Sequence, residues 1–181
     1  WVSVGSYGVL GSFASGAGFT NLARRYFSAA RASKPAPADE RDLVMLNMAQ
    51  VSFHMGRGEL TMSRERARSG ALHARSLGDR RGVAIFEHQL AMVAMYEGRL
   101  DAMLAHALQC AELVSEGDER SSEAALMART VGLAYYVLGR YEDGDAYMRR
   151  RAREVPQEEV LTVAAFDSTR ALLLVRLGQV D

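Results

Sequence analysis

Cysteine and net charge are the two things this sequence has least of. The 181 residues contain a single cysteine, Cys110, which excludes an intramolecular disulfide and leaves nothing that points to an oxidising compartment. The 22 basic and 22 acidic residues cancel, whereas a protein that neutralises nucleic-acid phosphates usually has a basic excess. We therefore expect a cytoplasmic protein without nucleic acid as its main partner.

Long apolar runs are missing as well. No run approaches the roughly 18 apolar residues that a membrane span requires, and the opening WVSVGSYGVLGSFASGAG lacks the basic start of a signal peptide. With 49% hydrophobic and 24% charged residues, the composition is typical of a globular chain with a sizeable core. We expect no membrane partner, and we interpret the apolar start as a helix from a longer protein.

Regularly spaced glycines are the strongest feature that is present. Glycine favours the positive φ that often ends a helix, and successive turn glycines are expected at spacings of 38, 42, 41 and 39 residues. These are Gly18, Gly56, Gly98, Gly139 and Gly178. A period near 40 residues predicts stacked helical hairpins. Leu77-Gly78-Asp79 and Glu116-Gly117-Asp118 repeat a second pattern, in which glycine ends one helix and aspartate caps the next.

The spacing predicts four hairpins, at residues 1–35, 39–78, 79–117 and 118–156, and a half hairpin at 157–181. Prolines at 35 and 37 cannot continue a helix; after them Asp39 is a predicted N-cap, with Glu40 and Asp42 in the first turn. The fold class is therefore all-α, with about nine antiparallel helices in one right-handed α-α superhelix. In the half hairpin we expect Val163, Phe166, Leu173 and Leu177 to be partly open or covered by another copy, so that the segment self-associates.

Residues 7–35 resemble a tetratricopeptide repeat. Tyr7, Leu10-Gly11 and Ala14 occupy its first-helix positions, and the second-helix set is Ala23, Phe27, Ala30 and Pro35. Residues 131–156 match again through Val131-Gly132, Tyr135 and Pro156, although Gly144 and Arg151 stand where the family prefers alanine. The period near 40 is similar to that of a longer form found in bacterial ATPase-linked signalling proteins. The resemblance implies a scaffold that binds proteins or peptides.

Catalytic and metal-binding patterns are absent from the sequence. The four histidines, His54, His73, His88 and His106, lie on different predicted helices, whereas zinc sites use short local spacings. No phosphate-binding glycine loop is present, and Cys110 lies among small residues at helical spacing, as expected of a packed core thiol. We expect no catalytic, cofactor or metal residues. The arginine runs at 64–68 and 149–153 are either a basic patch or, as we favour, solvated outer faces.

The resemblance implies that first helices line an inner wall where ligands bind. Offsets from the turn glycines place nine candidate residues there, which are Gln50, Phe53, His54, His88, Met92, Met95, Tyr96, Arg129 and Tyr136. The same offsets also select Leu133, Ser168, Leu172 and Arg176. Aromatic and methionine side chains with a few cations fit an amphipathic peptide or helix, although some of these side chains would pack between repeats instead.

Two other functions remain open from the sequence. One is a ligand-sensing segment of an ATP-dependent transcriptional activator or an ATPase-linked nucleotide cyclase, because the LGDRRG and EGRLD phrases resemble such regions. The other is an enzyme or nucleic-acid binder built on a helical repeat. The expected function is a protein-interaction scaffold.

Overall fold

The computed structural model describes residues 4–33, 40–115, 122–156 and 159–179, and within these ranges the chain is helical with no strand. This confirms the all-α fold class. The helices are α1 (Val4–Gly16), α2 (Thr20–Ala32), α3 (Glu40–Gly56), α4 (Leu60–Ser76), α5 (Arg80–Tyr96), α6 (Leu100–Ser115), α7 (Ser122–Val137), α8 (Tyr141–Arg151) and α9 (Val160–Arg176), with one 3₁₀ turn at Ala152–Glu154. The helix pairs lie within a few residues of the predicted hairpin bounds.

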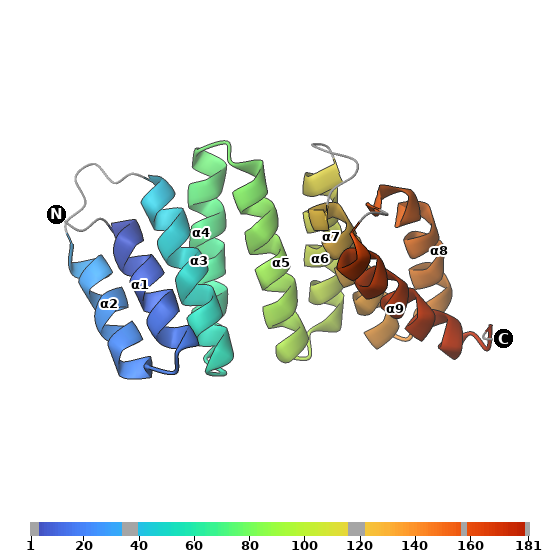
Figure 1. Cartoon of the computed structure of the whole chain (residues 1–181), viewed down its shortest axis with the longest axis horizontal. Helices are drawn as coiled ribbons and strands as arrows, with labels where there is room; N and C mark the ends of the chain where they lie inside the picture. Colours follow the sequence, from blue (N-terminus) through green and yellow to red (C-terminus); the bar gives the residue numbers. More distant parts are fainter. Residues whose placement is uncertain (1–3, 34–39, 116–121, 157–158, 180–181) are drawn as a thin grey trace. The chain divides into compact units, whose positions relative to one another are not determined.

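The chain divides into two compact units, Trp1–Val93 and Ala94–Asp181, so the boundary falls inside α5. In the first unit, α1 packs against α2 and α3, and α3 packs against α4 (Figure 1). In the second unit, α7 packs against α6, α8 and α9. A first helix thus packs against its own partner and against the next first helix, which is the arrangement of a helical repeat.

The turns within the hairpins and the turn between α4 and α5 share one backbone structure. In each, a glycine with φ between 67° and 82° follows the helix. In the first turn the Gly18 N–H donates to the Ser15 carbonyl at 2.9 Å, and the Phe19 N–H donates to the Ala14 carbonyl at 2.8 Å. This pair of bonds is a Schellman motif, which satisfies carbonyls at the helix end. The same pair recurs at Gly58, Gly78, Gly98, Gly139 and Gly178.

One turn glycine was predicted wrongly. Gly56 is the last residue of α3, and Gly58 is the residue with positive φ, at 71°. Two glycines flank Arg57, so helix-stop chemistry alone allowed either of them to end the helix. With Gly58 in place of Gly56, the spacings between turn glycines become 40, 40, 41 and 39 residues, a more regular repeat than the one predicted.

Two alanine substitutions test this register. Gly58→Ala is expected to lower the free energy of unfolding by about 1–2 kcal/mol, because an L-residue is strained at this φ. Gly56→Ala should instead be neutral or raise it by up to about 1 kcal/mol, since alanine favours a helix. Neither glycine has an atom within 4 Å of an added methyl group, so backbone conformation alone sets the difference. Chemical denaturation of both variants measures this difference in the free energy of unfolding. A Gly56→Ala variant less stable than Gly58→Ala would indicate that Gly56 is the turn glycine.

Glycines inside the helices allow close packing. A methyl group on Gly11 would lie 2.4 Å from the Phe27 ring, and one on Gly132 would lie 2.6 Å from the Met148 sulfur. Gly144, where the resembled family has alanine, would carry a methyl 2.8 Å from Leu173 and 2.9 Å from Tyr135. The departure at Gly144 therefore tightens the packing of α8 against its neighbours.

Several local predictions are confirmed. Glu40 and Asp42 lie in the first turn of α3, and the Asp79 carboxylate caps α5 by accepting a 2.8 Å hydrogen bond from the Gly82 N–H. Cys110 is buried, with its sulfur 2.9 Å from that of Met127. The predicted caps at Asp39 and Asp118, with Gly117, lie outside the described residues.

The expected open face of the last helix was half wrong. Val163 and Leu177 are half-buried, but Phe166 and Leu173 are fully enclosed. These two side chains belong to a core shared with Met148 and Val155, because α9 packs on both α7 and α8. The exposed apolar side chains of α9 lie on other faces of the helix.

Candidate functional site

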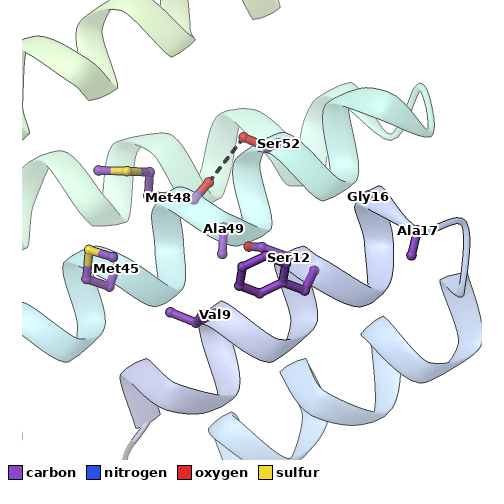
Figure 2. Close-up of a pocket in the computed structure, with 9 residues that line it drawn as sticks. Val9, Ser12, Gly16, Ala17, Met45, Met48, Ala49 and Ser52 are labelled. Carbon is purple, nitrogen blue, oxygen red and sulfur yellow. Dashed lines mark hydrogen bonds between the residues drawn. The ribbon is translucent and has the colours of Figure 1, made fainter.

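A groove of about 730 Å³ lies between α1 and α3 in the first unit. Figure 2 shows side chains from both helices turned toward it. The lining residues are Val9, Ser12, Phe13 and Gly16 from α1, Ala17 from the turn after it, and Met45, Met48, Ala49 and Ser52 from α3. The small residues keep the groove open while the larger ones offer apolar surface.

The groove is lined mainly by apolar side chains, and two of the largest are exposed to solvent. Phe13 is 74% exposed and Met45 is 47% exposed. The only side-chain polar groups in the lining are two hydroxyls, and both are already used: Ser12 donates to the Gly8 carbonyl and Ser52 to the Met48 carbonyl. A charged ligand group would lose water here without gaining an ion pair, so the lining favours an apolar ligand surface.

The corrected turn register accounts for two of the four α3 residues that line the groove. His88 and Arg129 lie ten residues before their turn glycines, and Met92 lies six before its own. Counted from Gly58, the same offsets give Met48 and Ser52, which both line the groove. The misplacement at Gln50 came from the choice of Gly56 as the turn, and the other two offsets, counted from Gly58, give Met55 and Gly56, which do not line the groove.

Two of the predicted α3 residues lie in the core. Gln50 is 1% exposed, and within the described part of the chain neither its amide oxygen nor its amide nitrogen has a hydrogen-bond partner. Phe53 is buried, with its ring centroid 5.2 Å from that of Phe27 in an edge-to-face contact. Neither side chain offers surface to a ligand in this structure.

His54 belongs to a charged cluster at the α3–α4 turn. Its Nδ1 lies 2.6 Å from one Glu59 carboxylate oxygen, and Arg57 donates to the other at 2.9 Å. Arg24 of α2 approaches the same carboxylate at 3.5 Å. Hydrogen bonds from His54 and Arg57 lower the pKa of Glu59 to about 2, against a smaller opposing effect of burial. The cluster thus holds the turn against α2 and leaves His54 engaged.

The four predicted residues of α5 are divided by the boundary between the units. His88 and Met92, in the first unit, are half-buried. In the second unit Met95 is half-buried and Tyr96 is exposed. Of these, Tyr96 offers the largest accessible aromatic surface.

Arg129 and Tyr136 lie on α7 in the second unit, and both are half-buried. The Arg176 guanidinium of α9 sits 5.8 Å from the centroid of the Tyr136 ring, a cation–π arrangement. A hydrogen bond with Tyr136 raises the pKa of Arg176. Tyr136 therefore joins α7 to α9 and is partly covered by the arginine.

The second arginine run, at residues 149–153, contributes to local packing. Arg149 forms a 2.8 Å ion pair with the buried carboxylate of Asp145, which Arg170 of α9 also contacts at 3.2 Å. Arg151 lies over the Tyr147 ring at 6.0 Å. In the other run, Ala67 is buried and Arg68 is exposed. The cations of the second run thus have structural contacts.

Within the described ranges, no three histidine, cysteine, aspartate or glutamate side chains gather into a group that could hold a metal ion. No described helix has both the length and the apolar character needed to cross a membrane. Comparison of the chain with family models, with curated proteins and with solved structures found no match.

Proposed function

We propose that this chain is a protein-interaction scaffold of the tetratricopeptide-like kind, and that the groove between α1 and α3 binds an apolar segment of a protein or peptide. The observation that carries the proposal is the exposed apolar surface of the groove, centred on Phe13 and Met45. Exposed contiguous apolar surface marks interaction sites in folded proteins. Methionine adapts to varied apolar partners because its unbranched thioether has several accessible rotamers.

The shape of the groove favours an elongated partner. Its lining comes from two adjacent helices, as Figure 2 shows, and not from a closed shell of elements. A helix or extended chain can lie along such a groove and place apolar side chains at helical or alternating spacing. The volume of about 730 Å³ also falls in the range of small-molecule pockets, which supports the ligand-sensing function as the second candidate.

Selection of peptides tests the proposal. A random peptide library displayed on phage is selected against the whole chain. The recovered peptides are then titrated by fluorescence anisotropy against the unsubstituted chain and against the Phe13→Asp and Leu72→Asp variants. We expect Phe13→Asp to weaken binding by about tenfold or more, because it removes the most exposed ring of the groove and adds an unpaired charge. Leu72→Asp is the matched control, since Leu72 is an exposed apolar residue of α4 outside the groove.

Two outcomes contradict the proposal. Peptides that tolerate Phe13→Asp but fail with Leu72→Asp would move the binding surface to α4. Failure to select any peptide, together with saturable binding of a small uncharged apolar probe such as Nile red that Phe13→Asp abolishes, would replace the scaffold with the ligand-sensing function.

A further inference from the structure

Helix α9 has one face in the core and one apolar face in solvent. Phe166, Thr169 and Leu173 are buried against the neighbouring helices of the second unit. On another face, Val160 is 75% exposed and Val175 is 59% exposed. Between them on that face lie the exposed residues Ala164, Asp167 and Ala171. We call Val160, Ala164, Asp167, Ala171 and Val175 the α9 outer face.

In the other first helices of the repeat, the residues equivalent to the α9 outer face are buried. Residues seven and fourteen positions before the turn glycine are buried in the other first helices. They are Val4 and Gly11, Val44 and Val51, Ala84 and Ala91, and Ala125 and Gly132. The equivalent residues of α9, counted from Gly178, are Ala164 and Ala171, and both are exposed.

Contacts in three hairpins identify the covering element as the second helix. Phe27 of α2 lies against Gly11, and Met148 of α8 lies against Gly132. In the α3–α4 hairpin the Ser63 hydroxyl of α4 donates to the Val51 carbonyl at 3.0 Å. In each second helix the residues five and nine positions after the turn glycine are buried. These two positions define the stripe of the second helix that covers the first.

The sizes of facing residues specify the partner further. A large side chain, Phe27 or Met148, lies opposite a glycine. Where the first helix has the larger residue Val51, the same register provides Ala67 on α4. Ala171 carries a methyl group, so a partner with phenylalanine or methionine opposite it would clash. The α9 outer face thus requires a small residue at this position.

Charge gives a second criterion. Asp167 is the one charged side chain of the α9 outer face, so a partner helix with excess arginine or lysine is favoured over an acidic one. Helix α4 meets both criteria, because it has Ala67 at the facing position and carries four arginines against one glutamate, LTMSRERARSGALHARS.

We propose that the α9 outer face binds a basic amphipathic helix built like α4, with alanine opposite Ala171. The proposal is independent of the groove between α1 and α3. The occupant is a helix of a different protein, defined by its apolar stripe of small residues and its basic charge.

A thiol-protection experiment tests this on the whole chain. Cys110 is the single cysteine and is 1% exposed, so Ala171→Cys introduces the only accessible thiol. The probe is a synthetic peptide with the residues Glu59 to Ser76, which contains no cysteine. At about 1 mM peptide, we expect the rate of maleimide alkylation at this thiol to fall by about fivefold.

Two controls test whether the protection is specific to the α9 outer face and whether it depends on the small residues of the peptide. Ala105→Cys places a thiol on an exposed position of α6, and its alkylation rate should not change with peptide. A peptide with Ala67→Asp and Ala71→Asp should give no protection. Equal protection of both thiols, or none at Ala171→Cys, would overturn the proposal. Protection of Ala171→Cys that rises with protein concentration in the absence of peptide would also overturn it, since a second copy would then be the occupant.

Discussion

Replacing Gly70 with alanine is expected to lower the free energy of unfolding by about 1–3 kcal/mol, the usual cost of forcing an extra methyl group into a packed core. The new methyl carbon would lie 2.1 Å from the tip of the Phe86 ring. Phe86 is fully buried, so its ring cannot swing into solvent to make room. The expected loss exceeds the gain of up to about 1 kcal/mol that alanine brings to a helix.

Urea denaturation of Gly70→Ala measures this loss, with Gly16→Ala as the matched control. Gly16 is also helical, and no atom lies within 4 Å of an added methyl group, so its substitution should not destabilise the chain. The double variant Gly70→Ala/Phe86→Leu should show a favourable coupling between the two sites, because the shorter side chain relieves the clash. A Gly70→Ala variant as stable as Gly16→Ala would contradict the close α4–α5 contact.

Replacing Gln50 with leucine is expected to raise the free energy of unfolding by about 1–3 kcal/mol, the cost of a buried polar group left without a partner. Within the described residues, both polar atoms of the buried Gln50 amide lack hydrogen-bond partners. Leu90 and Val131, which lie the same eight residues before their turn glycines, are buried and apolar. A leucine at position 50 would therefore match these two repeats, whereas the same offset gives the exposed Leu10 in α1 and the half-buried Arg170 in α9.

Thermal unfolding followed by circular dichroism checks this increase. For a chain of this size, a change of 1 kcal/mol corresponds to about 2–4 °C in Tm. Gln109→Leu is the control, because Gln109 is exposed on α6 and its substitution should change stability by less than about 0.5 kcal/mol. A Gln50→Leu variant that unfolds at a lower temperature than the parent would show that the amide is satisfied.

Helical periodicity and helix-stop chemistry were sufficient to predict the fold class and most helix ends. They did not decide between Gly56 and Gly58, because both suit a helix terminus. The order of the residues that follow does distinguish the two glycines. Gly58-Glu59-Leu60 matches Gly98-Arg99-Leu100, with one residue between the turn glycine and the first apolar residue of the next helix.

The candidate site depended on that choice. A two-residue shift along α3 turns the helix by about 200° at 3.6 residues per turn, so it moved the expected face from Met48 and Ser52 to the buried Gln50. The α1 side of the groove carried a composition signal, the large apolar Phe13 among small residues. Periodicity alone could not show whether these α1 residues face the core or solvent, because packed and open apolar faces of a helix have the same spacing.

Close packing around glycine was the other unpredicted feature. Sequence shows that Gly144 replaces a favoured alanine, but not whether a neighbour fills the space. In the structure Leu173 of α9 does so, and this is why Leu173 is buried where an open face was expected. Such complementarity depends on which helices meet, and it therefore requires the tertiary structure.

The central claim is that the groove between α1 and α3 is the binding surface, and methyl NMR of the methionines tests it most directly. Met45 and Met48 line the groove, whereas Met62 is exposed on α4, and Met103 and Met148 are buried in the second unit. Titration with a selected peptide should shift the methyl resonances of Met45 and Met48 and leave those of Met62, Met103 and Met148 in place. Shifts confined to Met62 or to the second unit, with Met45 and Met48 unchanged, would contradict the account.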